Sequence, residues 1–101
     1  MKRARFSDLA RAELLAEVAY YENRRPGLGA RFRIEVEAAS EHAAASPKSA
    51  PLIARLARRR QLPTFPFRII YTETDYGILI HAVAHNRRSP AYWVQRLEDE
   101  A

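Results

Sequence analysis

The sequence contains no cysteine and no long hydrophobic run. Without cysteine the chain has neither a disulfide framework nor a cysteine-based zinc site. The N-terminal segment MKRARFSDLARAEL lacks an apolar stretch of signal-peptide length, and no later segment is apolar over the roughly 20 residues that a bilayer-spanning helix needs. We therefore expect a soluble cytoplasmic protein without membrane association, folded as one domain over residues 1–101.

Acidic residues are scarce in the second half of the chain. Residues 46–97 contain 9 Lys or Arg but only Glu73 and Asp75, whereas residues 1–45 contain 8 basic and 7 acidic side chains. The formal net charge of +5 is therefore concentrated after residue 45. This distribution favours an acidic protein or a nucleic-acid phosphate backbone as partner. The alternative is an arginine-rich surface that only keeps the protein soluble.

The stretch from Phe65 to Trp93 organises the predicted fold. Two runs rich in aromatic and β-branched residues, 65–73 and 77–84, flank the turn-forming sequence Thr74-Asp75-Tyr76-Gly77. Alternation along an antiparallel pair with this four-residue loop predicts two faces. One face is wholly apolar and needs a cover of helices: Phe67, Ile69, Tyr71, Ile78, Ile80, Ala82 and Ala84. The other is half apolar and suits a partner or substrate: Arg68, Ile70, Thr72, Leu79, His81, Val83 and His85.

Two helices are predicted before this hairpin. The first covers residues 8–24 and follows the N-cap candidates Ser7 and Asp8, and the second starts within Arg25-Pro26-Gly27-Leu28-Gly29 and ends at Pro47. The short connection predicts an antiparallel helical hairpin. The second helix has a single apolar stripe of helical period: Leu28, Phe32, Val36, Ala39 and Ala43.

The first helix has apolar residues on two sides. The larger stripe makes one apolar face, comprising Leu9, Ala12, Leu15, Ala16, Ala19 and Tyr20, and a helix that is apolar on two sides is expected to be covered on both. A second stripe, Leu14, Val18 and Tyr21, lies on roughly the opposite side of the helix. Either the second helix or a partner protein covers this second stripe.

The remaining elements complete an α+β fold. Lys2 to Phe6 fits an edge strand, and Arg58 to Leu62 is expected to pair with residues 66–73 in a three-stranded meander. Ser89 and Pro90 suit the start of a short helix with Trp93 and Leu97 on one side. The predicted fold is thus an N-terminal strand, an antiparallel helical hairpin packed on a small antiparallel β-sheet, and a short C-terminal helix.

Two histidines, His81 and His85, are four residues apart on one predicted strand, and hence on one face. That spacing exceeds the spacing in an ordinary two-histidine metal site and no carboxylate stands nearby, so we expect no metal and no cofactor. Metal-free RNA cleavage needs a general base, a general acid and cations at the phosphate, which these histidines with Arg68, Arg88 and Tyr92 are able to supply. The structural alternative, which we favour, is that His85 orders the arginine turn and His81 is a partly buried sheet residue.

Six arginines are candidates for an anion-binding side of the sheet: Arg58, Arg59, Arg60, Arg68, Arg87 and Arg88. Arginine binds carboxylate and phosphate groups through two parallel hydrogen bonds. Arg68 is the most informative of them because it interrupts an apolar strand. In the expected register neither Glu73 nor Asp75 lies beside it, so we favour a functional role over a structural ion pair.

An ordered set of short motifs covers nearly the whole chain. They are Tyr20-Tyr21-Glu22, Pro26-Gly27-Leu28-Gly29, Arg31-Phe32, Glu35-Val36, Arg59-Arg60, Phe65-Pro66-Phe67-Arg68-Ile69-Ile70-Tyr71, and Ala82-Val83-Ala84-His85-Asn86-Arg87-Arg88 with Pro90, Tyr92 and Trp93. With this set the chain resembles the ParE/RelE superfamily of toxins from type II toxin–antitoxin, or plasmid stabilisation, systems, and most of all its ParE branch. The resemblance implies a RelE/ParE-like fold and a hetero-oligomer with a cognate acidic, ParD-like antitoxin.

The superfamily implies two different activities. RelE-like members are ribosome-dependent mRNA endonucleases that use several Lys or Arg residues and often a C-terminal Tyr, whereas ParE-like members poison DNA gyrase. Arg68 and Tyr92 resemble two positions of the nuclease set, but Asn86 stands where that set has an arginine, and its lysines are replaced by Arg58 to Arg60. An arginine does not lose its proton as a base. The motif HNRRSPAYW is closer to the ParE branch, so we expect a gyrase inhibitor acting by contact rather than an enzyme.

The two activities assign roles to overlapping residues. Contact with gyrase would involve Arg68, Arg87, Arg88, Tyr92 and Trp93. The alternative, a metal-free mRNA endonuclease, would use Arg68, His85, Arg88 and Tyr92. In both cases the antitoxin is expected to cover Leu14, Val18, Tyr21, Arg58, Arg59 and Arg60. A member that only binds its antitoxin and regulates transcription with it is a third, weaker alternative.

Overall fold

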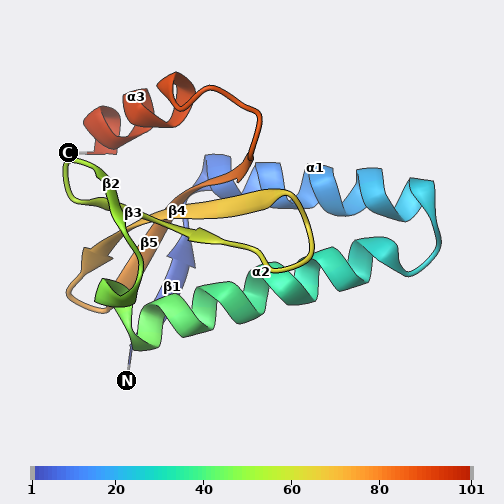
Figure 1. Ribbon diagram of the computed structural model, residues 1–101, viewed down its shortest axis with the longest axis horizontal. Coiled ribbons are helices and arrows are strands. Elements are labelled where there is room, and N and C mark those ends of the chain that lie inside the picture. Colours follow the sequence, from blue (N-terminus) through green and yellow to red (C-terminus); the bar gives the residue numbers. More distant parts are fainter. Residues whose placement is uncertain (1, 101) are drawn as a thin grey trace.

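The computed structural model describes residues 2–100 as one five-stranded sheet with helices on both faces (Figure 1). The strand order is β1-β5-β4-β3-β2. Strand β1 runs parallel to β5, and the other neighbours are antiparallel. The strands are β1 (Arg3–Phe6), β2 (Leu52–Ala54), β3 (Ala57–Gln61), β4 (Phe67–Thr74) and β5 (Gly77–His85).

The helices α1 (Asp8–Arg24) and α2 (Leu28–Ala45) form the predicted hairpin, which covers one face of the sheet (Figure 1). The Ser7 hydroxyl accepts a hydrogen bond from the Ala10 N–H at 3.1 Å, as an N-cap should. Across the connection, the Glu22 carboxylate accepts bonds from the Gly27 and Gly29 N–H groups at 2.9 and 3.0 Å. These bonds satisfy backbone donors that have no partner within α2.

The core between hairpin and sheet matches the prediction for α2 and for most of the central strands. Phe32, Val36, Ala39 and Ala43 are buried on α2, with Leu28 partly buried beside them. Beneath them, the first predicted apolar face is buried at five positions: Phe67, Ile69, Tyr71, Ile78 and Ile80. The helical hairpin therefore covers the face that the alternation assigned to it.

The prediction that α1 is covered on both apolar sides was wrong for the larger stripe. Leu14 is only 7% exposed, and Val18 and Tyr21 pack partly buried against the same core. By contrast, Leu9, Leu15 and Tyr20 are 56%, 53% and 51% exposed. The start of α1 is fixed by the Ser7 N–H, which donates to the Ile80 carbonyl at 2.9 Å. This bond depends on the pairing of β1 with β5, which cannot be read from the spacing of apolar residues in the helix.

The β4–β5 pair contains a bulge that the sequence did not predict. Tyr71 pairs with Ile80 as expected, but Ile70 pairs with Ala82, so His81 is the extra residue. Arg68 consequently lies opposite Ala84 and not Val83. Beyond the bulge the two faces exchange members: Val83 joins the core under the helical hairpin, while Ala82 and Ala84 join the core on the other face.

Helix α3 (Ala91–Glu100) covers the second face of the sheet (Figure 1). Trp93 and Leu97 lie on one side of α3, as predicted, and that side is buried against Ala57, Ile70 and Ala82. Strand β3 pairs with β4 as expected. The sheet nevertheless has five strands, because β1 joins it beside β5 and the loose segment after Pro47–Ser49, a 3-10 turn, contains β2.

Candidate functional site

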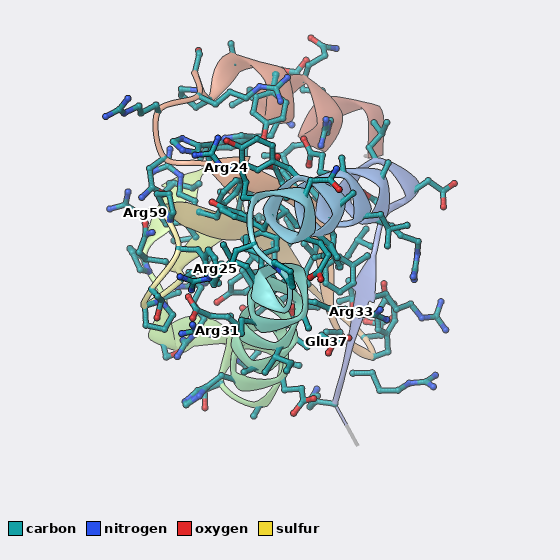
Figure 2. All side chains as sticks on the ribbon, turned by 90° about the vertical axis from the view of Figure 1, so that its right-hand side faces the viewer. Arg24, Arg25, Arg31, Arg33, Glu37 and Arg59 are labelled. Carbon is teal, nitrogen blue, oxygen red and sulfur yellow. The ribbon has the colours of Figure 1, made fainter. Side chains whose placement is uncertain are left out.

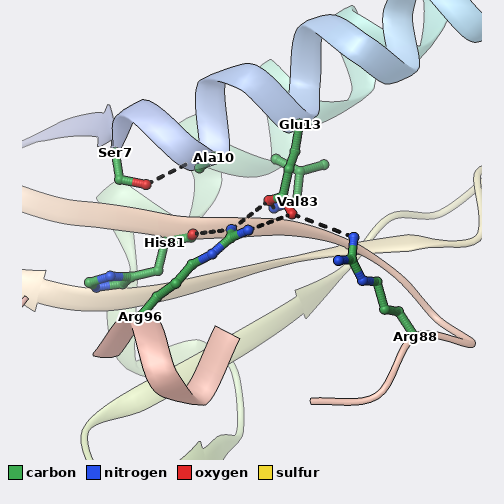
Figure 3. Close-up of polar contacts among 7 residues, drawn as sticks. All are labelled: Ser7, Ala10, Glu13, His81, Val83, Arg88 and Arg96. Atoms are coloured by element: carbon green, nitrogen blue, oxygen red, sulfur yellow. Dashed lines mark hydrogen bonds and ion pairs between the residues drawn. The ribbon is translucent and has the colours of Figure 1, made fainter. Parts of the chain in front are cut away.

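The candidate site lies where the end of β5, the arginine turn and α3 meet. Strand β1 ends at Phe6, which pairs with Ile80, so from residue 81 onward β5 has β4 on one side and no described strand on the other. Two side chains satisfy backbone groups along this stretch (Figure 3). The Glu13 carboxylate accepts a bond from the Val83 N–H at 3.0 Å, and Arg96 donates to the His81 carbonyl at 3.1 Å. Side chains thus protect a strand edge that would otherwise be open.

Glu13 also holds α3 to the opposite helix. The Arg96 guanidinium donates to both oxygens of the Glu13 carboxylate, at 2.9 and 3.1 Å (Figure 3). Both side chains are only 16–17% exposed. Arg88 extends this cluster with a nitrogen 4.0 Å from the same carboxylate. A two-pronged, poorly hydrated arginine–carboxylate pair of this kind fixes position as well as charge.

The ring of Tyr92 lies against both arginines of this cluster. The guanidinium carbon of Arg88 is 3.8 Å from the ring centroid, and that of Arg96 is 4.8 Å away. Burial, reinforced by the negative charge of Glu13, raises the pKa of the Tyr92 phenol to about 12. The phenol therefore stays protonated at neutral pH. It is suited to binding through its ring and is a poor general base.

The arginine turn is ordered by His85. The backbone N–H of Arg87 donates to the His85 ring at 3.1 Å, and the Arg88 N–H donates to the His85 carbonyl at 3.0 Å. The His85 ring also stacks edge-on against Phe67, with centroids 5.0 Å apart. These contacts agree with the structural interpretation of His85. Arg87 and Arg88 themselves are exposed.

The two histidines do not share a face, contrary to the prediction. The extra residue of the bulge is His81, which is 3% exposed and lies 2.8 Å from the Thr72 hydroxyl. His85 pairs with Phe67, whose side chain faces the helical hairpin. Arg68, one residue along β4, therefore points to the other face. The structure brings Arg88 and Tyr92 together but does not place His85 with Arg68.

Trp93 is in a different environment from the one expected of a contact residue. It is 3% exposed in the core between α3 and the sheet. Its position supports α3, and through α3 the placement of Tyr92. Arg68 is half-buried on the same side of the sheet, with no ion pair found for it among the described residues.

The three arginines of β3 do not converge on one surface. Arg58 and Arg60 pair with Tyr71 and Ile69, whose side chains face the hairpin, whereas Arg59 pairs with Ile70 on the other face. Arg58 donates a hydrogen bond to the Ala50 carbonyl at 2.7 Å and so holds the segment before β2 against β3. Alternation along a strand makes three consecutive residues diverge.

The sequence did not indicate Glu13 and Arg96 as site residues. Glu13 and Arg96 are 83 positions apart in the chain, so no local sequence pattern connects them. The one usable signal is spacing, because Arg96 follows Tyr92 by four residues on a helix. Among the side chains that the structure describes, within residues 2–98, no group of three or more His, Asp or Glu is placed to hold a metal ion. No helix in this part of the chain is long and apolar enough to cross a membrane.

The fold and its motifs match a known family. The model of the family described as "ParE toxin of type II toxin-antitoxin system, parDE" matches residues 4–90. The chain belongs to the ParE toxin family. It is thus a ParE-type toxin of a type II toxin–antitoxin system. The matched segment stops before α3, so Tyr92, Trp93 and Arg96 lie outside it.

A solved structure has the same fold as this toxin. It is a chain from the chromosomal ParDE toxin–antitoxin system of P. aeruginosa, with a TM-score of 0.72 and 17% sequence identity. The match covers 84% of this chain and 96% of that chain. No curated protein matches at a significant level. The structural likeness confirms the predicted α+β fold.

Proposed function

We propose that this toxin inhibits DNA gyrase by protein–protein contact and is neutralised by a cognate acidic antitoxin. The observation that carries the proposal is the exposed Arg87-Arg88 turn, with Tyr92 fixed behind it by the Glu13–Arg96 pair. Exposed arginines beside an anchored aromatic ring are typical of residues that dominate binding to a protein surface. The target-binding residues are Arg68, Arg87, Arg88 and Tyr92, with Trp93 acting from the core.

The geometry favours contact over RNA cleavage. A metal-free nuclease requires a base and an acid near one phosphate. His85 and Arg68 face opposite sides of the sheet, and the Tyr92 phenol, with a pKa of about 12, resists deprotonation. The remaining groups, Arg68 and Arg88, bind anions without transferring a proton. For these reasons the RelE-like activity remains the alternative.

A supercoiling assay with purified gyrase and purified toxin tests the proposal. We expect the toxin to inhibit supercoiling, and we expect the Arg87→Glu/Arg88→Glu variant to need roughly tenfold more protein for the same inhibition, as loss of a binding hot spot implies. Arg33→Glu is the control, because Arg33 forms an exposed ion pair with Glu37 on α2. Unimpaired supercoiling together with codon-specific cuts in ribosome-bound mRNA would establish the nuclease alternative instead.

Binding of an antitoxin is the second part of the proposal. Toxin–antitoxin pairing is a property of the family, and this chain carries a formal net charge of +5, which suits an acidic partner. Leu14, Val18 and Tyr21 are too well covered to be its main contacts in this conformation. Of the basic segment, Arg59 is exposed, while Arg58 and Arg60 are partly buried.

A further inference from the structure

A groove of about 720 Å³ lies between the β2–β3 hairpin, the turn end of β4 and β5, and α3. It is at the opposite end of β5 from the Arg87-Arg88 turn, because it is lined by Leu79 and His81 and not by residues after His85. Figure 1 shows the β2–β3 turn beside the end of α3, and the Arg55–Glu98 contact at 3.8 Å joins the two. We call this the β2–β3 groove.

Most of the exposed lining of the β2–β3 groove is apolar. Leu79 and Leu97 line its inner part, and Leu52 and Leu56 line its outer wall. Leu52 is 55% exposed, and Leu56 at 78% is the most exposed large hydrophobic residue among those described. Four leucines around one concave surface make the groove a candidate binding site.

The turn that presents Leu56 is conformationally strained. Ala54 pairs with Ala57, so Arg55 and Leu56 form a two-residue hairpin turn. Arg55 has φ of +50°, a left-handed conformation that glycine, asparagine or aspartate adopts more readily. The turn therefore places a strained arginine and an exposed leucine where ordinary turn residues would be more stable. Strain held at one spot suggests that these side chains serve binding.

The charges on the rim of the β2–β3 groove are mainly positive. Lys48, Arg55 and Arg58 line it, against a single acidic residue, Glu73. Arg58 is engaged with the Ala50 carbonyl, and the only acidic partner found for Arg55 within residues 2–98 is the exposed Glu98. The rim thus matches a partner that carries carboxylates.

We propose that the β2–β3 groove binds an acidic, amphipathic segment of the antitoxin, an inference that rests on the proposed antitoxin partnership. Apolar side chains of that segment lie over Leu52, Leu56, Leu79 and Leu97, and its carboxylates pair with Lys48 and Arg55. A second copy of the toxin is a poorer occupant, because two basic rims would then face each other.

The test uses the product of the reading frame adjacent to the toxin gene, purified and titrated calorimetrically into purified toxin. We expect Leu56→Glu to raise the Kd at least about tenfold, as removal of a binding anchor does. Ile34→Glu is the matched control, since Ile34 is a 64% exposed leucine-sized residue on α2, and its Kd should stay within about twofold of wild type. Arg55→Glu should raise the Kd about fivefold or more, while Arg33→Glu, which breaks the Arg33–Glu37 pair of similar exposure, should not.

Arg55→Gly separates binding from folding. Glycine relaxes the left-handed turn, so the melting temperature of the free toxin should rise, while the affinity for the adjacent-frame product falls about threefold or more through loss of the charge. A residue with a structural role only would change the melting temperature and leave the Kd unaltered. Hydrogen exchange should show new protection at residues 52–57 in the complex.

The outcomes distinguish failure of the groove proposal from failure of the proposed antitoxin partnership. Unchanged Kd values for Leu56→Glu and Arg55→Glu, with tight binding by wild type, would overturn the groove and leave the antitoxin partnership intact. No binding by wild type would overturn the partnership and the groove with it, and the gyrase assay would then stand alone. If the toxin is a dimer in solution and Leu56→Glu converts it to a monomer, the occupant of the groove is a second copy of the toxin and not the antitoxin.

Discussion

Glu13 accepts hydrogen bonds from an edge strand and from α3 through one carboxylate. Its residue type is essential, because only an ionised carboxylate has enough acceptor sites for the Val83 N–H and a two-pronged arginine at once. The residue also supports the proposed target-binding site at a distance. By fixing Arg96 it fixes Tyr92, against which Arg88 of the exposed turn stacks.

Glu13→Gln should lower the free energy of unfolding by about 2–3 kcal/mol, because it leaves the poorly hydrated Arg96 charge without its partner. Glu37→Gln is the control, since the Arg33–Glu37 pair is half exposed at 3.4 Å. That change should cost no more than about 0.5 kcal/mol. Urea unfolding of both variants measures the difference, and equal losses would show that the Glu13 cluster contributes no more than a surface ion pair.

Tyr92→Phe removes a hydroxyl but keeps the ring that contacts Arg88 and Arg96. If Tyr92 acts through contact, growth inhibition and gyrase inhibition should persist, with binding changed by no more than about 1 kcal/mol, the net value of one hydrogen bond. A catalytic acid or base would instead lose roughly 100-fold or more in rate. Tyr92→Ala, which also removes the ring, should abolish inhibition. Ribosomal mRNA cuts that disappear in Tyr92→Phe would contradict the contact mechanism.

At the scale of elements, the helical hairpin depends on a close approach between α1 and α2. A Cβ added at Gly29 would lie 2.4 Å from the Val18 carbonyl oxygen and 2.9 Å from the Glu22 Cβ. The Val18 carbonyl belongs to the backbone of α1, so it cannot move aside as a flexible side chain would. Gly27, two residues earlier, has φ of +88° but nothing within 4 Å of an added Cβ. The two glycines are therefore needed for different reasons, packing and backbone conformation.

Gly29→Ala should destabilise the toxin by about 2–3 kcal/mol, as overpacking against rigid backbone does, even though alanine is the better helix former. Gly27→Ala should cost only about 1–2 kcal/mol, the strain of a left-handed alanine. Thermal unfolding of the two variants provides the comparison. A more stable Gly29→Ala protein would mean that the helices separate readily and that the close approach is not required.

Apart from β2 and the 3-10 turn, the sequence predicted which elements form, but not how two of them are oriented. Phe32 and Val36 identify the buried side of α2 because no second apolar stripe competes with them. In α1 two apolar stripes compete, and the attachment of Ser7 to β5 decides between them. The bulge at His81 is likewise invisible to alternation, and it reassigns every residue of β5 that follows. Arg88 and Tyr92, which belong to both predicted sites, lie side by side in the structure, whereas Glu13 and Arg96 become neighbours only through the fold.

At the scale of the whole molecule, the fold gathers on one side basic residues from the first 45 positions, where charge appears balanced along the sequence. Residues 1–45 are nearly neutral, yet Arg24, Arg25 and Arg31 lie on one side of the molecule together with Arg59 of β3 (Figure 2). Arg33 and Glu37 lie on the other side and neutralise each other at 3.4 Å. The positive field therefore comes from the end of the helical hairpin as well as from the sheet. A field of this kind increases the rate of encounter with an acidic partner.

Arg31 and Arg33 allow the contribution of this field to be measured within one helix. Arg31→Glu and Arg33→Glu change the net charge equally, but only Arg31 lies on the basic side (Figure 2). Arg31→Glu should slow association with the adjacent-frame antitoxin about threefold at low ionic strength and flatten its salt dependence, with the dissociation rate nearly unchanged. Arg33→Glu should have a smaller effect because Glu37 already offsets its charge. Stopped-flow association at several salt concentrations measures both rates. Equal slowing by the two variants would mean that net charge, and not the arrangement of arginines on one side, directs the encounter.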